Sequence, residues 1–323
     1  MNFKPIKEGS DKVDGFALVK QAEVKTSSKG GKYLDIDLAD KDGEINGKYW
    51  DYTDGEYNPG DLVKVRGTIS EYNGRPQMRI ELIRLATFQD NVNVADYVKS
   101  ADYRPEDMFA KICEIICRFS DEDLKKICLK VYEDNKEKLL YYPAALRLHH
   151  AMLGGLLFHT LSIMTTALKV CEVYPQIDKD LLVAGAALHD IGKLEEIESS
   201  TLGVASEYSI DGNLIGHLVR GAFIVRKTGE ELGIDEEKIR LLEHMLLSHH
   251  GNPEYGAAVR PMFLEASVLN MLDDLDAKIY EISEFASEVE PGTLTQRQWA
   301  LDNVRIYNHG RKEIKPMANL IEE

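Results

Sequence analysis

The chain of 323 residues contains little cysteine, four residues in all, together with ten prolines and two tryptophans. Four cysteines are too few for a disulfide framework, and we expect all of them to be reduced thiols. No run of uncharged apolar residues approaches the ~18 to 20 needed to cross a bilayer, so no membrane partner is expected. Residues 1–15 contain no apolar signal core, which favours a cytoplasmic location.

Positive charge is also scarce, but only in one part of the chain. The formal net charge is −16, from 39 basic and 55 acidic residues. Residues 1–100 carry 15 basic and 17 acidic residues (net −2), whereas the remaining 223 carry 24 and 38 (net −14). This distribution does not exclude a nucleic-acid partner, but it requires that such a partner bind at a local surface.

Residues 1–90 have the pattern of short strands separated by turns. Leu34, Ile36 and Leu38 alternate with Asp35 and Asp37, which is the period of a half-buried strand. Glycine, asparagine and proline mark the breaks between such segments. Five strands are predicted, at about 15–25, 32–39, 43–51, 61–70 and 75–86. Five strands in so short a segment favour an all-β barrel of the OB-fold type as the N-terminal domain.

After residue 90 the apolar period becomes helical. Pro105 suits the first position of a helix, and the pattern shows no internal repeats. We predict a helical linker region over 91–143, an all-α domain over 144–310 and a C-terminal tail over 311–323. Within this part, helices are predicted at 144–173, 179–190, 213–229, 235–249, 261–287 and 294–307.

The placement of histidine is the strongest chemical signal. All nine histidines follow residue 148, and an adjacent pair, His189-Asp190, lies in the segment LHDIGK. Imidazole and carboxylate groups suit Mn, Fe, Co, Ni or Zn, and one carboxylate can bridge two ions. Adjacent helical residues point about 100° apart, so other helices must supply the remaining ligands. The candidates are His159, His217, His249, His250 and Asp273.

The set His159, His189-Asp190 and Asp273 resembles the H…HD…D signature of the HD-domain metal-dependent phosphohydrolases. A closer resemblance, to the YhaM-type 3′→5′ exoribonucleases, extends over essentially the whole chain. Its motifs here are HHAMLGGLLFHT, HDIGKLEE, EYSIDGNLIGHL, LLSHHG, MLDDLDAK and EPGTLTQRQWALDN. The resemblance implies an OB-fold followed by an HD domain. It also implies manganese- or cobalt-dependent removal of nucleotides from single-stranded 3′ ends of RNA and often DNA.

The resemblance further implies a role for each site residue. The first metal would be held by His159, His189, Asp190 and Asp273, and the second by His217, His249, His250 and the bridging Asp190. Lys193 resembles a phosphate-contacting lysine and would act in catalysis with Asp190. Three alternatives stay open: Asp274 as the terminal ligand, a tandem His249-His250 pair that uses one residue only, and Lys193 as a helix C-cap.

Other polar residues have simpler interpretations. His149, His150 and His309 fit structural or surface roles, and Glu195, Glu196 and Glu198 fit a solvated run. In the barrel, aromatic and basic side chains are typical of a single-strand binding surface, although core packing and charge balance explain them equally well. These nucleic-acid-binding candidates are Tyr33, Lys48, Trp50, Lys64, Arg66 and Arg79.

The sequence therefore predicts a two-domain hydrolase that degrades single-stranded RNA, and also single-stranded DNA, to 5′-mononucleotides. Two divalent metal ions per chain are expected, with manganese favoured over Co, Fe, Ni or Zn. One alternative is a phosphohydrolase that acts on nucleotides or cyclic dinucleotides. Another is a non-catalytic RNA-binding module. A homo-oligomer is compatible with the acidic helical part.

Overall fold

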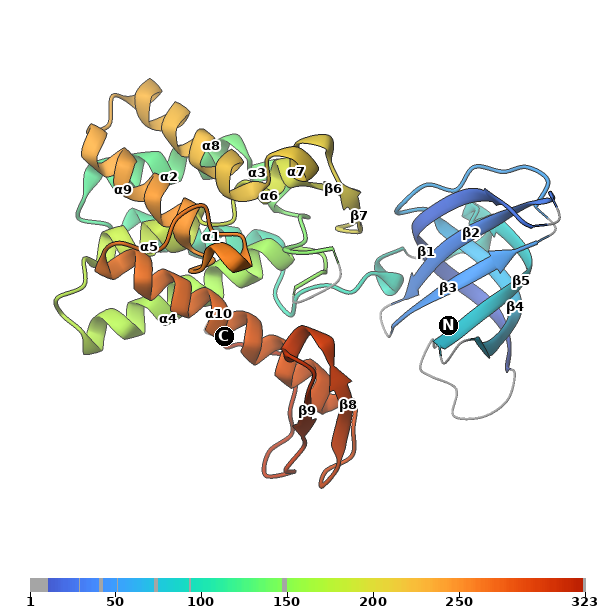
Figure 1. Cartoon of the computed structure of the whole chain (residues 1–323). Coiled ribbons are helices and arrows are strands. Elements are labelled where there is room, and N and C mark those ends of the chain that lie inside the picture. The colour runs from blue at the N-terminus through green and yellow to red at the C-terminus, as the bar shows by residue number, and fades with distance from the viewer. Residues whose placement is uncertain are drawn as a thin grey trace. The chain divides into compact units, whose positions relative to one another are not determined.

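The computed structural model describes residues 11–28, 30–40, 43–50, 52–72, 75–92, 94–146 and 150–321. The chain forms two compact units (Figure 1). The first comprises residues 1–100 together with 198–207, and the second comprises 101–197 and 208–323. His149 lies outside the described residues.

The first unit is a closed barrel in which the strands follow the order β1-β2-β3-β5-β4. Strands β3 and β5 pair in parallel, and the other neighbours are antiparallel. The strands are β1 (Asp11–Thr26), β2 (Lys32–Asp40), β3 (Gly43–Tyr49), β4 (Leu62–Tyr72) and β5 (Arg75–Leu85). The predicted five-stranded barrel is confirmed.

Alternation along the strands fills the interior of the barrel. Leu34, Ile36 and Leu38 are at most 2% exposed, because successive side chains of a strand point to opposite faces. At Gly67 the pairing register shifts between β4 and β5, and a Cβ atom there would lie 2.3 Å from the carbonyl oxygen of Arg79. Glycine is required at this position because the two backbones approach too closely for any side chain.

The second unit is mainly helical. Its helices are α1 (Pro105–Cys117), α2 (Glu122–Asp134), α3 (Lys136–Leu139), α4 (Gly155–Val173), α5 (Lys179–Leu188), α6 (Lys193–Glu196), α7 (Ile210–Leu214), α8 (His217–Leu232), α9 (Glu236–Ser248) and α10 (Leu264–Ser287). Short strands β8 (Leu294–Gln298) and β9 (Val304–Tyr307) of this unit pair with each other. Strands β6 (Ile197–Ser199) and β7 (Ala205–Tyr208) also pair with each other, and they lie mostly within 198–207, the segment that groups with the first unit.

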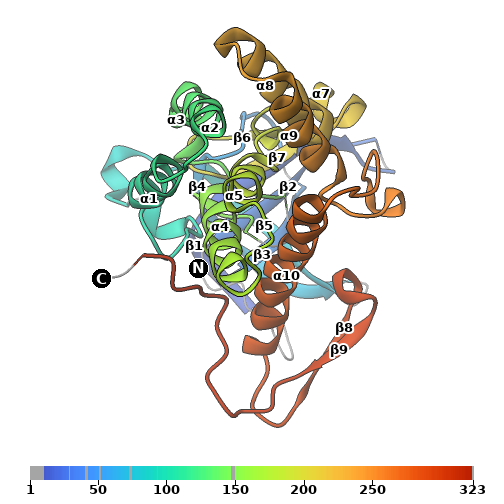
Figure 2. The same ribbon diagram turned by 90° about the vertical axis from the view of Figure 1, so that its left-hand side faces the viewer.

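Helix α4 forms the centre of this unit. It packs against α1, α5 and α10, and Figure 2 shows α4 and α5 side by side. Its length and apolar composition would also suit a membrane span, but more than half of it is buried inside the protein. The apolar character of α4 is therefore accounted for by its place in the core.

The helix predicted at 144–173 is wrong in its first part, because α4 begins only at Gly155. His150 and Gly154 have left-handed backbone conformations, with φ of 58° and 69°. A Cβ atom on Gly155 would lie 1.9 Å from the carbonyl oxygen of His150. The chain thus folds back on itself before the helix, which helical periodicity alone does not reveal.

The helix predicted at 294–307 is also wrong. This segment forms strands β8 and β9, joined by a short 3-10 turn at Trp299–Leu301. Asp302 and Asn303 follow the turn with φ of 51° and 61°, a conformation that these two residue types tolerate better than most. The spacing of Leu294, Leu301 and Val304 imitates a helical period, although the segment is a hairpin.

Residues 101–143 and 311–321, on either side of the predicted all-α domain, belong to the helical unit. Helix α1 packs against α4, and α2 packs against α5 and α8. Both α1 and α2 lie in the segment 91–143, for which the sequence predicts a helical linker region. At the other end, the hydroxyl of Tyr103 donates to the carbonyl of Ala318 at 3.0 Å and accepts from the amide of Leu320 at 3.2 Å. The predicted tail is thereby attached to the start of this unit.

Candidate metal centre

The predicted ligands converge from five places in the helical unit. His159 lies on α4, and His189 and Asp190 lie at the C-terminal end of α5. His217 opens α8, the pair His249-His250 follows α9, and Asp273 lies on α10. His159, His189 and His249 are fully buried, and Asp190 is 2% exposed. Packing of the helices thus places these seven polar side chains in one interior site.

A first group forms around one oxygen of Asp190. Its Oδ2 atom lies 3.6 Å from Nε2 of His159 and 3.3 Å from Nε2 of His189. Oδ1 of Asp273 lies 3.1 Å from Nε2 of His159 and 3.9 Å from Nε2 of His189. Four donor atoms therefore surround one point, which is the arrangement that a single metal ion requires.

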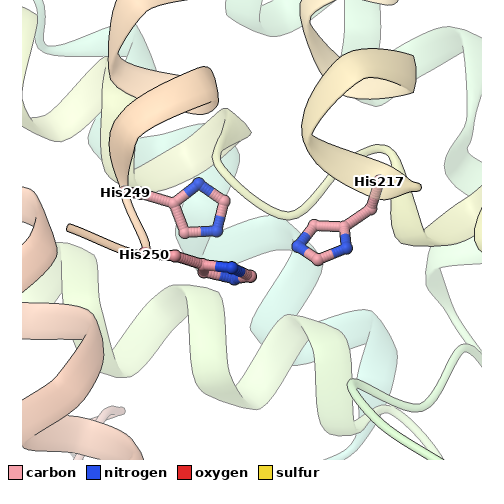
Figure 3. A group of neighbouring side chains, drawn as sticks. All are labelled: His217, His249 and His250. Carbon is pink, nitrogen blue, oxygen red and sulfur yellow. The ribbon is translucent and has the colours of Figure 1, made fainter. Parts of the chain in front are cut away.

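A second group forms around the other oxygen of the same carboxylate. Oδ1 of Asp190 lies 3.6 Å from Nε2 of His217 and 3.7 Å from Nε2 of His249. Ring nitrogens of His217, His249 and His250 lie within 4.8 Å of one another, and Figure 3 shows the three rings gathered together. The two oxygens of Asp190 thus face two different groups of imidazoles, which is the geometry of a bridging carboxylate.

In four of the five rings, those of His159, His189, His217 and His249, the nitrogen Nδ1 already has a hydrogen-bond partner. Nδ1 of His189 donates to the carbonyl of Ala186, and Nδ1 of His249 donates to that of Leu246, each at 2.8 Å. A proton on Nδ1 leaves Nε2 with a lone pair for a metal. Among the described residues, Nε2 of His217 and of His249 is buried without a hydrogen-bond partner. The residues present therefore fit divalent metal ions with nitrogen and oxygen ligands.

Lys193 lies beside the carboxylate of Asp190. Its Nζ atom is 2.6 Å from Oδ2 of Asp190, and its side chain is 12% exposed. Burial lowers the pKa of Lys193, but the charge and hydrogen bond of Asp190 outweigh burial and raise that pKa. Burial likewise disfavours the charged form of Asp190, yet Lys193 and His189 hold the pKa of this carboxyl well below its usual range. Both groups are charged at neutral pH.

The geometry bears on two alternatives that the sequence leaves open: whether Asp273 or Asp274 is the terminal ligand, and whether His250 is a ligand beside His249. Asp274 points to the surface, with its side chain 57% exposed and paired with Lys278 at 2.6 Å, whereas Asp273 faces the first group. His250 has a buried Nδ1 atom without a hydrogen-bond partner in the described part of the chain, and it belongs to the second group. The geometry thus favours Asp273 and keeps His250 in the ligand set.

Sequence reasoning missed Asp276 and the role of His150. Oδ2 of Asp276 lies 2.7 Å from Nδ1 of His159 and 2.9 Å from Nε2 of His150, and the hydroxyl of Ser162 donates to Oδ1. Burial lowers the pKa of His159, but hydrogen bonds to Asp273 and Asp276 outweigh it and raise that pKa to about 10. The spacing of three residues between Asp273 and Asp276 on one helix was the available signal.

Glu196 contradicts the prediction of a solvated run. It is 9% exposed, and its Oε1 atom accepts from the amide of His217 at 3.0 Å and from Nδ1 of the same residue at 2.8 Å. Its neighbours behave as expected for surface residues: Glu195 pairs with Arg220, and Glu198 is exposed. Glu196 thus orients the ring of His217 as Asp276 orients that of His159.

The barrel candidates divide into one cluster and two separate residues. The rings of Tyr33 and Trp50 stack with centroids 4.5 Å apart, and Nζ of Lys48 lies 5.7 Å from the Tyr33 centroid. Lys48 is the pairing neighbour of Arg79 on β5 and also contacts Asp35.

The remaining two basic residues are engaged elsewhere. Lys64 lies over Phe16, with Nζ 5.6 Å from the ring centroid, and Arg66 approaches Glu81 to 4.0 Å. Tyr33, Lys48, Trp50 and Arg79 are therefore the members of the predicted set that form a joint surface, which we call the β2–β3 cluster.

Comparisons with known proteins agree with both units. A model of the HD domain matches residues 156–278, and a model of an OB-fold nucleic acid binding domain matches residues 19–86. The predicted fold, an all-β OB-fold barrel followed by an all-α HD domain, is thereby confirmed.

Three curated proteins, each called 3′-5′ exoribonuclease YhaM, match the chain over 303 residues, or 93% of its length. The protein of Bacillus licheniformis is 35% identical and is covered over 96% of its own length. That of a Geobacillus species is 37% identical and 93% covered, and that of Bacillus subtilis is 34% identical and 96% covered. A solved chain of a replication protein A heterotrimer bound to ssDNA matches 25% of this chain and 61% of its own length, at 16% identity and a TM-score of 0.22.

Proposed function

Because this chain belongs to the YhaM family of 3′-5′ exoribonucleases, we propose that it hydrolyses single-stranded RNA from the 3′ end through a binuclear metal centre. The products would be 5′-mononucleotides, and single-stranded DNA would be a second substrate. The observation that carries the binuclear site is the position of Asp190, whose two oxygens face two separate groups of imidazoles. Manganese is the ion we favour.

The metal centre opens into a cleft large enough for a strand end. The cleft has a volume of about 970 Å³ and is lined by Asp190, Lys193, His217, His250 and Asp273, among others. When bound, divalent ions in such a site activate water and stabilise charge on a transferring phosphate. His159, His189, Asp190 and Asp273 would hold one ion, and Asp190, His217, His249 and His250 the other.

Lys193 would act on the phosphate directly. Its buried ammonium group is charged and lies at the wall of the cleft, beside Asp190. A fixed positive charge in a water-poor site stabilises the negative charge that develops on phosphate oxygens during displacement. Glu196 and Asp276 would hold His217 and His159 in the orientation that exposes Nε2 to the site.

The β2–β3 cluster would bind the strand on the barrel. Stacked aromatic rings offer π-faces to bases, and adjacent basic groups hold phosphates. Trp50 is 48% exposed, and Lys48 and Arg79 lie beside each other on neighbouring strands. A strand-binding surface explains why an enzyme that acts on a polymer contains the barrel. A hydrolase of mononucleotides would not need such a surface.

The test is the digestion of a 5′-labelled single-stranded RNA with Mn²⁺, run beside Asp190→Ala and a lane that contains only Mg²⁺. A descending ladder from the 3′ end that is absent in Asp190→Ala would support the proposal. A single internal cut would contradict exonucleolytic action. Intact RNA together with turnover of nucleotides or cyclic dinucleotides would contradict a polymeric substrate. Metal-dependent cleavage by Asp190→Ala would contradict the assigned centre.

A further inference from the structure

The hairpin formed by β8 and β9 carries the motif EPGTLTQRQWALDN, which the metal centre does not use. Figure 1 shows the hairpin beside the C-terminal end of α10, against which both strands pack. Ala300 and Asp302, at its turn, line the same cleft as Asp190 and Lys193. The hairpin therefore borders the cleft that leads to the metal centre.

The hairpin combines arginine with exposed aromatic rings. Arg297 pairs with Arg305 across the two strands, and Leu294 pairs with Tyr307. Trp299, the first residue of the turn, is 72% exposed, and Tyr307 is 54% exposed. Two like charges directly opposite each other destabilise a strand pair, so this arrangement is unfavourable for an isolated hairpin.

Neither arginine is neutralised within the described part of the chain. Arg297 donates from Nη1 to the carbonyl of Asn303 at 3.0 Å, and Arg305 donates from Nε to that of Thr295 at 2.9 Å. No carboxylate of the described residues forms an ion pair with either of them, whereas Arg220 and Arg226 of the same unit pair with two or more each. Each guanidinium has five N–H donors, so most of them remain available for a ligand.

Arg297 and Arg305 form a basic segment within an otherwise acidic part of the chain. Residues 101–323 carry 38 acidic and 24 basic residues, yet the segment 291–310 contains Arg297 and Arg305 against a single Asp302. A basic surface with exposed aromatic rings suits the phosphates and bases of a single strand. An acidic protein partner would satisfy the arginines but would leave the position of the hairpin beside the cleft unexplained.

We propose that the β8–β9 hairpin binds the single-stranded substrate as it enters the cleft, with Arg297 and Arg305 on backbone phosphates and Trp299 stacked on a base. This proposal rests on the proposed function and assigns a substrate-binding surface in the helical unit, separate from the barrel. Each arginine would neutralise one phosphate, and the ring of Trp299 would tolerate any base.

The test measures RNA binding by the full, metal-loaded chain. Fluorescence anisotropy would follow a labelled RNA of about 12 nucleotides, with phosphorothioate linkages that slow hydrolysis, across a series of salt concentrations. Arg297→Ala/Arg305→Ala should reduce the slope of log K against log salt by about 1.4, since each lost phosphate contact on a single strand contributes about 0.7. Trp299→Ala should weaken binding at least about fivefold with little change in slope.

Two further variants complete the test. Arg297→Lys/Arg305→Lys keeps both charges and should restore most of the slope. Arg118→Ala/Arg240→Ala removes two exposed arginines that pair with Glu114 and Glu237, and it should bind RNA as the parent chain does. Thermal melting verifies that each variant is folded.

An unchanged slope in Arg297→Ala/Arg305→Ala would overturn the proposal. A change of oligomeric state in light scattering that accompanies the loss of binding would overturn it too, because the hairpin would then be a contact between copies. The outcome is independent of the digestion assay: a chain that binds RNA through the hairpin but does not cleave it would contradict the proposed function alone.

Discussion

Oδ2 of Asp276 lies 2.7 Å from Nδ1 of His159, on the side of the ring away from the candidate ligand nitrogen Nε2. The same oxygen contacts Nε2 of the buried His150 at 2.9 Å. A carboxylate in this position fixes both the tautomer and the orientation of a metal-binding imidazole. The candidate metal centre thus depends on groups outside the predicted ligand set.

Asp276→Asn should weaken metal binding to the first group by about 10- to 100-fold, because an amide in place of the carboxylate removes the charge that holds His159. Calorimetric titration with Mn²⁺ measures the effect. Asp274→Asn is the matched control, since Asp274 lies on the same helix but is exposed and paired with Lys278. Equal affinities of the two variants would contradict the orienting role of Asp276.

Glu196→Gln should weaken metal binding by the second group, that of His217, His249 and His250, in the same way. Its Oε1 atom is the acceptor for Nδ1 of His217, and a glutamine can present its NH₂ group there instead. The expected loss of affinity is about 10-fold or more, confined to one of two ions. Glu198→Gln, two residues away and exposed, should bind both ions as the parent does. Loss of both ions in Glu196→Gln would indicate unfolding of the site instead.

The number of metal ions per chain tests the bridging role of Asp190. We expect about two ions in the parent chain, about one in His217→Ala and close to none in Asp190→Ala. Elemental analysis of dialysed protein measures these values directly. One ion in the parent, lost equally in both variants, would contradict a binuclear centre.

Trp50→Ala should weaken the binding of single-stranded RNA by roughly 5-fold or more, because the stacked pair of Tyr33 and Trp50 loses its exposed face. Anisotropy with a labelled oligonucleotide measures the change. Phe88→Ala, which removes a fully exposed ring from the same unit, is the control and should leave affinity unaltered. Equal losses in both variants would show that the β2–β3 cluster has no special role.

Asp121→Ala should lower the free energy of unfolding by about 1 kcal/mol, because Asp121 caps α2. Burial raises the pKa of Asp121, but hydrogen bonds from Lys238 and from the amides of Leu124 and Asp123 outweigh it and lower that pKa. A depressed carboxyl pKa stabilises the fold above about pH 4 and ceases to do so as the pH falls further.

The stability difference between the parent and Asp121→Ala should therefore shrink below about pH 4. Urea unfolding at several pH values measures it. Glu133→Ala, at an exposed position of the same helix, serves as the control and should change stability little at any pH. A difference that is independent of pH would contradict the electrostatic contribution of the cap.

The local sequence pattern was sufficient to predict much of the fold and most of the candidate site. Alternation in segments such as Leu34–Leu38 predicted the barrel, because strands with one buried face repeat every two residues. The separated histidines and aspartates predicted the candidate ligands, because so many polar groups rarely enter a core without a shared partner. Pattern failed at 294–307, where hairpin and helix have similar apolar spacing, and at 144–154, where left-handed backbone at His150 and Gly154 interrupts the helix.

The sequence by itself determined the two-domain architecture and the set of candidate ligands, since both follow from residue types and their periods. Only the tertiary structure decided which oxygen of Asp190 faces which imidazoles, and that Glu196 and Asp276 are buried behind two of the rings. It likewise placed Arg297 opposite Arg305 beside the cleft. These relationships join residues that are distant in the chain, and packing of the helices and pairing of the strands bring them together.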